Sequence, residues 1–175
     1  MTAEVTAPRD AEARAAGDAL TAIYRAAVPA MRDLPVFNPA LDVAAIGFRA
    51  VEDHAFGIMV TPWFMNLVRL PLDREAACGR RHGDVVTRVL PVGALEFTIG
   101  QLDGVGLIES CSLFSPMFDF ADQPAVETAA VAALAAIFEP EAAAEDVSPP
   151  EAHSTIATTV DRRSLLRGAW MERRP

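Results

Sequence analysis

The chain contains no lysine, and all fifteen of its basic residues are arginine. Its twenty-four acidic residues leave a net charge of −9, which argues against a protein that follows a nucleic-acid backbone. Histidine occurs three times and cysteine only twice, as Cys78 and Cys111. Neither residue type shows the spacing of a metal site or a catalytic motif. The sequence therefore predicts no bound metal and no cofactor.

Long hydrophobic runs are also missing. The longest, near Ile58–Leu72, is broken by two prolines and by Asn66 and Arg69, so it is too short and too polar to cross a bilayer. Residues 1–9 carry charges and no apolar core of a signal peptide. We therefore expect a cytoplasmic protein without membrane insertion. One disulfide between the two cysteines is conceivable, but nothing in the sequence indicates an oxidising compartment, so we expect two reduced thiols, at least one of them buried.

A first helix is predicted by apolar residues that recur every three or four positions between Asp10 and Met31. The residues before Asp10 are expected to form a frayed leader. Pro29 is expected to end the helix near Ala27, because proline lacks the backbone donor that a helix needs. Two further prolines predict an extended connector over Leu34–Leu41.

The middle of the chain changes to the two-residue period of β-strands. The Asp103-Gly104 pair predicts a tight hairpin with a type I′ turn, since both residues tolerate a positive φ. A polar loop is expected over 72–84. The predicted strands cover residues 43–51, 56–60, 63–70, 85–90, 95–102 and 105–113.

A second helix is predicted after these strands. Asp122 is suited to cap it, Pro124 falls in its first turn, and an apolar stripe runs from Val126 to Phe138. The predicted fold class is α+β: an antiparallel β-sheet of about five or six strands, flanked by an N-terminal and a C-terminal helix. We assign residues 1–138 to this domain.

Residues 139–175 differ from the rest in composition. Residues 139–151 hold five carboxylates, three prolines and no base, which predicts a flexible linker. Residues 152–175 hold five arginines against two acidic residues and form a basic tail. This part of the chain is expected to lie outside the folded domain.

Large apolar residues gather beside two prolines, Pro62 and Pro116. Each group suits an ordinary core. Methionine, however, repacks around varied partners, so the two groups together also predict an adaptable groove for an apolar or helical peptide. The groove requires that the two segments lie side by side. The candidate binding residues are Trp63, Phe64, Met65, Phe114, Met117 and Phe118.

A catalytic site would have to use His54, His82 or Cys111. None of them has a neighbour that completes a known spacing, and the chain has no nucleophile elbow, Walker motif or dinucleotide fingerprint. The Arg80-Arg81-His82 run reads as a solvated loop or as a patch for an anion. An enzyme thus has no positive support and stays an alternative.

Residues 61–65, 90–93, 97–105 and 110–117 form four sequence blocks. In this order along the chain they resemble the HybE/HupJ family of [NiFe]-hydrogenase assembly chaperones. The resemblance covers about residues 10–138, and Arg162–Gly168 resembles the basic end of the family. Some members carry a fused rubredoxin module, which needs Cys-x-x-Cys pairs that this chain lacks.

The resemblance implies a non-enzymatic cytoplasmic chaperone without a cofactor of its own. Such proteins are expected to hold a hydrogenase subunit precursor, especially the small subunit with its twin-arginine signal peptide, until cofactor insertion is complete. One alternative is a chaperone for the large subunit, or for both subunits, that leaves the signal peptide alone. Another is a scaffold for an accessory protein that delivers the metal cofactor.

The basic tail is itself similar to a twin-arginine motif. It reads either as a solvated end or as a segment that occupies the client groove in cis until the true signal displaces it. The residues of this possible autoinhibitory segment are Arg162, Arg163, Leu165, Leu166 and Arg167.

Overall fold

The computed structural model describes residues 3–73 and 81–140, with side chains from Pro8 onward. Six strands form one antiparallel sheet in the order β1-β2-β3-β6-β5-β4. The sheet and its two helices confirm the predicted α+β class. The elements are α1 (Ala3–Met31), β1 (Ala44–Val51), β2 (His54–Val60), β3 (Met65–Pro71), β4 (Val85–Leu90), β5 (Gly93–Leu102), β6 (Gly106–Phe114) and α2 (Gln123–Phe138).

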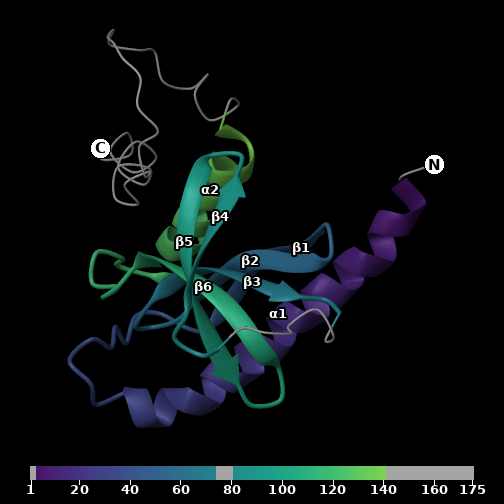
Figure 1. Cartoon of the computed structure of the whole chain (residues 1–175). Helices are drawn as coiled ribbons and strands as arrows, with labels where there is room; N and C mark the ends of the chain where they lie inside the picture. The colour runs from purple at the N-terminus through teal and green to yellow at the C-terminus, as the bar shows by residue number, and fades with distance from the viewer. Residues whose placement is uncertain (1–2, 74–80, 141–175) are drawn as a thin grey trace, which may run out of the picture.

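The two helices cover opposite faces of the sheet. Leu20 of α1 is buried with Phe48 and Val68 on one face. Val126 of α2 is buried with Phe97, among others, on the other. In Figure 1, α1 runs along β1–β3, while α2, seen behind the β4–β5 hairpin in this view, contacts β1 and β2 from the other face. The α1 face therefore carries a helix only over one half of the sheet.

The first helix is longer than the sequence predicted. It begins at Ala3 and continues through Pro29 to Met31, so both the frayed leader and the end near Ala27 are wrong. Pro29 lies in the last turn, where the missing donor removes one hydrogen bond. The turn persists because Val28 packs against the core on the α1 face and its carbonyl accepts from Arg32 N at 3.0 Å.

The start of α1 is tied to the β1–β2 turn. Arg9 pairs with Asp53 and also donates to Glu52 O, while the Asp10 carboxylate accepts from Ala50 N at 2.8 Å. These tertiary contacts hold a segment that periodicity alone gave no reason to order.

The connector after α1 is not extended. Three successive turns fold it, with Leu34 N donating to Met31 O, Phe37 N to Leu34 O and Leu41 N to Asn38 O. Proline fixes φ near the value that the second position of such turns requires, so the same prolines that suggested an extended chain suit a turn.

The predicted strands and the capped second helix are confirmed, but one turn type is wrong. Gly104 has φ +81°, while Glu52 is the only non-glycine with a positive φ among residues 3–73 and 81–140. Asp103 therefore lacks the positive φ that a type I′ turn requires. The hairpin uses a three-residue connection with Gly104 in the left-handed position, and Val105 N donates to Leu102 O.

Gly57 provides a test of the packing under α1. A methyl group at this position would lie 2.2 Å from Phe48 Cδ2, because the buried Phe48 ring rests on the bare backbone of β2. We expect Gly57→Ala to lower the free energy of unfolding by about 1–3 kcal/mol, measured by urea denaturation. Gly100→Ala on β5 is the control, since its methyl would meet Ile108 at 3.3 Å; equal losses in both variants would contradict the prediction.

Candidate functional site

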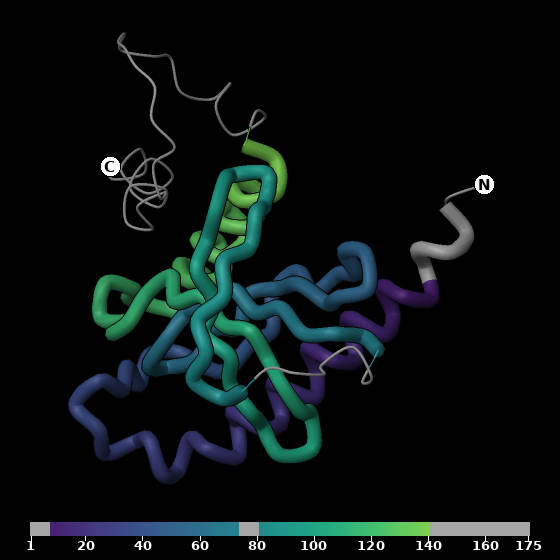
Figure 2. The backbone as a smooth tube through the Cα atoms, in the orientation of Figure 1, coloured from purple at the N-terminus to yellow at the C-terminus, as the bar shows by residue number. Residues whose placement is uncertain are grey.

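Three chain segments meet at the end of the sheet where β2 leads into β3. They are the turn at residues 61–64, the connector at 32–42 and the loop at 115–122. Thr61 organises the turn, because its Oγ1 accepts from Phe64 N at 2.9 Å while its own N–H donates to Phe64 O. Ser115 Oγ then donates to Trp63 O at 3.3 Å and joins the loop to the turn. Figure 2 shows the connector and the loop on the same side of the molecule.

Asn38 binds all three segments together. Its Nδ2 donates to Met117 O at 3.0 Å and to Phe120 O at 2.9 Å, and its backbone N–H donates to Pro62 O at 2.8 Å. Its Oδ1 accepts from Ala40 N at 3.0 Å. The residue is only 7 % exposed, so these hydrogen bonds satisfy groups that water does not reach. Asn38 is therefore the polar centre of this end of the molecule.

Aromatic rings fill the space around these hydrogen bonds. Phe37 stacks on Trp63 with centroids 6.2 Å apart, and Phe114 meets Phe120 edge to face at 5.1 Å. On the α1 side, Tyr24 meets Phe64 edge to face at 5.2 Å, and burial raises the pKa of the Tyr24 hydroxyl. The rings hold the three segments in one packed unit.

The structure brings the two predicted apolar segments together, since Met65 pairs with Phe114 across β3 and β6. It also places most of the candidate residues inside. Met65 and Met117 are 0 % exposed and Trp63 is 8 % exposed, so these side chains pack in the core. Phe64 and Phe114 are half-buried. Of the six, Phe118 is the one that is well exposed, at 57 %.

The accessible part of the site is an apolar surface with acidic neighbours. Leu34, on the connector, is 45 % exposed, and Phe118 is the exposed apolar residue of the loop that Asn38 joins to this connector. The same two segments carry four exposed aspartates against a single arginine, Arg32. We call this surface the Phe118 face and define it by Leu34, Phe118, Asp33, Asp42, Asp119 and Asp122. Sequence reasoning missed Leu34 and Asn38, because their positions depend on how the connector folds back.

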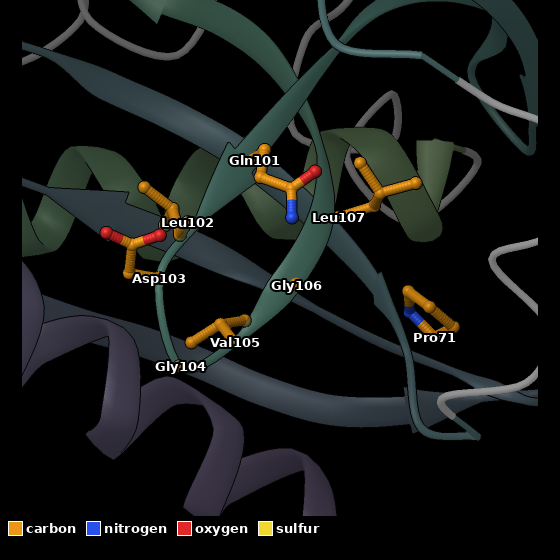
Figure 3. A pocket seen from close by; sticks show the side chains of 8 residues that line it. All are labelled: Pro71, Gln101, Leu102, Asp103, Gly104, Val105, Gly106 and Leu107. Atoms are coloured by element: carbon orange, nitrogen blue, oxygen red, sulfur yellow. The ribbon is translucent and has the colours of Figure 1, made fainter.

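A hollow of about 310 Å³ lies at the opposite end of the sheet, against the β5–β6 hairpin. Figure 3 shows Gln101, Leu107 and Pro71 around it, with Asp103 in the turn. Its described lining residues include no aromatic side chain and a single ionisable one, Asp103. It is separate from the Phe118 face.

The residues of the catalytic alternative lie apart. Cys111 is buried in β6 opposite Leu67, whereas His54 starts β2 opposite Pro71, about 13 Å further along the strands. His82 is exposed in the turn before β4. Within residues 3–73 and 81–140 no three metal-binding side chains form a cluster. Cys78 and the tail residues Arg162, Arg163, Leu165, Leu166 and Arg167 lie outside the described residues.

No helix in the described part of the chain is long and apolar enough to cross a membrane. The family model for [NiFe]-hydrogenase assembly, chaperone, HybE matches residues 15–168. The chain therefore belongs to the HybE family of [NiFe]-hydrogenase assembly chaperones.

Individual relatives agree with this family. The hydrogenase expression/formation protein HupJ of Bradyrhizobium diazoefficiens is 47 % identical over 166 residues, which cover 94 % of this chain and 95 % of that protein. The probable rubredoxin HupJ of Rhodobacter capsulatus is 38 % identical over 115 residues, 66 % of this chain and 41 % of that protein. The solution structure of HybE from Escherichia coli shares the fold, with a TM-score of 0.52 at 22 % identity, over 83 % of this chain and 90 % of that one.

Proposed function

We propose that this chain is a non-catalytic, cytoplasmic chaperone that binds the precursor of a [NiFe]-hydrogenase small subunit through its twin-arginine signal peptide. The observation that carries the proposal is the Phe118 face, where exposed apolar side chains and aspartates share two segments joined by Asn38. Holding the signal would delay export until the cofactor is in place. The chain needs no cofactor of its own for this role.

The chemistry of the Phe118 face matches the two parts of such a signal. Paired arginines are attracted to Asp33 and Asp119, which are exposed and flank the apolar residues in sequence. The apolar stretch that follows the arginines in a signal peptide would pack on Phe118 and Leu34, which present ready-made apolar area. The buried Met65 and Met117 support this surface from below and take no direct part.

Calorimetric titration of the full chain with a synthetic small-subunit signal peptide tests the proposal. A parallel titration uses the same peptide with both arginines changed to alanine. We expect binding to the first peptide and weaker binding to the second, with a dependence on salt that reflects the charged contacts. Absence of binding to either peptide would reject the proposal and direct attention to a folded surface, such as that of the large subunit.

The Phe118→Ala variant locates the binding surface. Because Phe118 is 57 % exposed, its truncation leaves the core intact, and we expect the affinity for the signal peptide to fall at least about tenfold. Val131→Ala is the matched control, since Val131 is 58 % exposed on the outer side of α2. If both variants bind as the wild type does while the peptide still binds, the Phe118 face is not the site.

A further inference from the structure

The two edges of the sheet differ in how they are protected against another strand. At β1 the register shifts between Ile46 and Arg49, where Gly47 adopts φ +62° as part of a bulge. The Asp10 carboxylate also accepts from Ala50 N, and Arg25 donates to Val43 O. Bulges and occupied backbone groups are the means by which proteins close an edge.

Within residues 3–73 and 81–140, the β4 edge shows neither a bulge nor a hydrogen bond from another segment to its outer backbone groups. β4 is the last strand of the sheet, and the described part of the chain holds no strand beyond it. Its six residues pair with β5 without a shift in register and include no proline, and its one charged side chain, Arg88, is turned to the α2 face, where it binds Glu109. A regular strand of this kind offers its free backbone groups to a further strand.

The direction of those backbone groups follows from the pairing with β5. Ile99 N donates to Asp84 O, and Leu90 closes the hairpin opposite Gly93. Since the bonded residues of an antiparallel pair alternate, the even-numbered residues of β4 point their N–H and C=O groups toward β5. The backbone groups of Val85, Thr87 and Val89 therefore point outward.

The same three residues also present exposed side chains. Val85 is 62 % exposed and Val89 is 85 % exposed, on the face of the sheet that α1 covers over β1–β3. The even-numbered residues lie on the other face, where Val86 and Leu90 pack against the core and Arg88 binds Glu109. The edge thus combines outward backbone groups with an uncharged row of valine, threonine and valine.

We propose that a second copy of this chain pairs with β4 in an antiparallel arrangement, with Thr87 opposite Thr87 on the two-fold axis. This register places Val85 opposite Val89 of the other copy. Every pair then consists of residues whose backbone groups point outward, so each exchanges both of its hydrogen bonds. Threonine pairs are among the cross-strand pairs that stabilise sheets, and valine is a residue that strands favour. The two sheets become one continuous sheet.

The pattern of side chains favours a second copy over a client peptide. A two-fold axis at Thr87 brings each Val85 against a Val89 and the two threonines together, so each copy meets only uncharged, β-branched side chains of the other. The three residues carry no charge that would select the arginines of a signal peptide. Dimerisation through β4 also leaves the Phe118 face uninvolved, so its test is independent of the proposed function.

Sedimentation equilibrium of the full chain, from micromolar to near-millimolar concentration, tests the proposal. We expect a reversible dimer that Val89→Lys weakens at least about tenfold, because the substitution places two lysines at the interface. Val131→Lys adds the same charge at an exposed valine of α2, away from β4, and should leave the dimer unchanged. Thr87→Pro should also abolish the dimer, because proline has no N–H to donate to the other copy. The substitution leaves the pairing with β5 intact, since the N–H of Thr87 points away from β5.

Cross-linking tests the register. In a Cys78→Ser background, Thr87→Cys should form a covalent dimer with a short bifunctional thiol reagent, while Val85→Cys alone should not, because its counterpart lies about four residues away. A monomer at all concentrations would overturn the proposal. So would a dimer that survives both Val89→Lys and Thr87→Pro. A monomer whose binding of the signal peptide is lost in Val89→Lys would assign the edge to the client instead.

Discussion

Asn38→Asp is expected to lower the free energy of unfolding by about 3–5 kcal/mol at neutral pH, because it places an uncompensated buried charge against two carbonyl oxygens, of which Met117 O keeps only its bond from Phe120 N at 3.3 Å. In the wild type one amide nitrogen serves both Met117 O and Phe120 O. The substitution turns this donor into a carboxylate oxygen that faces two carbonyl oxygens at hydrogen-bond distance. The residue is 7 % exposed, so water cannot relieve the repulsion. Urea denaturation measures the loss.

The pH dependence separates repulsion from simple truncation. Burial and the facing carbonyls disfavour the charged form of the introduced carboxyl, so its pKa in the folded state lies above the unfolded value of about 3.9. A raised pKa means that the penalty is largest at neutral pH and shrinks as the pH falls and the carboxyl becomes a donor. Asn38→Ala lacks this dependence and serves as the control. A loss in Asn38→Asp that does not change with pH would contradict the account.

The sheet could be predicted because its strands carry their own period. In β5, Leu95, Phe97 and Ile99 are buried and alternate with exposed residues, which the sequence shows directly. The start of α2 was equally readable, since Asp122 accepts from Ala125 N as a cap should. Both signals are local, so no knowledge of the tertiary structure was needed.

The errors came from features that distant contacts decide. Pro29 lowered the expected length of α1, but Val28 packs on the sheet and retains the last turn. The φ of Asp103 could not be read from its type, because aspartate tolerates positive and negative values alike. In each case the preference of a single residue type did not predict the conformation, because contacts with distant parts of the chain decide it.

The candidate site was half predictable for the same reason. The sequence placed large apolar residues in Trp63–Met65 and Phe114–Phe118, and these segments do lie together. Which of these side chains face water depends on the connector, because Asn38 donates a hydrogen bond to Met117 O and holds the loop against the connector. A methionine beside a proline has no local signal that separates a core position from a surface one. The exposure of Phe118, with Met117 beside it buried, emerged only from the fold.

Glu109→Ala is expected to lower the free energy of unfolding by about 3–5 kcal/mol, the usual cost of removing one partner from a buried ion pair. On the α2 face of the sheet, Glu109 accepts from Arg69 at 2.8 Å and from Arg88 at 2.8 and 2.7 Å. The Glu109 side chain is 6 % exposed. Its hydrogen bond to Arg88 raises the pKa of that guanidinium. Without the carboxylate, two adjacent positive charges remain in a largely dry site. Thermal and urea unfolding measure the effect.

Two further variants show whether the loss in Glu109→Ala comes from the buried ion pairs. Glu96→Ala, an exposed carboxylate on the other face of the neighbouring strand, should change stability by at most about 1 kcal/mol. The triple change Arg69→Met/Arg88→Met/Glu109→Leu should recover most of the loss, because apolar side chains of similar volume replace buried ion pairs at little cost. A loss in Glu109→Ala no larger than in Glu96→Ala would show that water screens the three groups. Failure of the triple change to recover stability would instead show that the network holds β3, β6, β5 and β4 in register, a role that apolar packing does not replace.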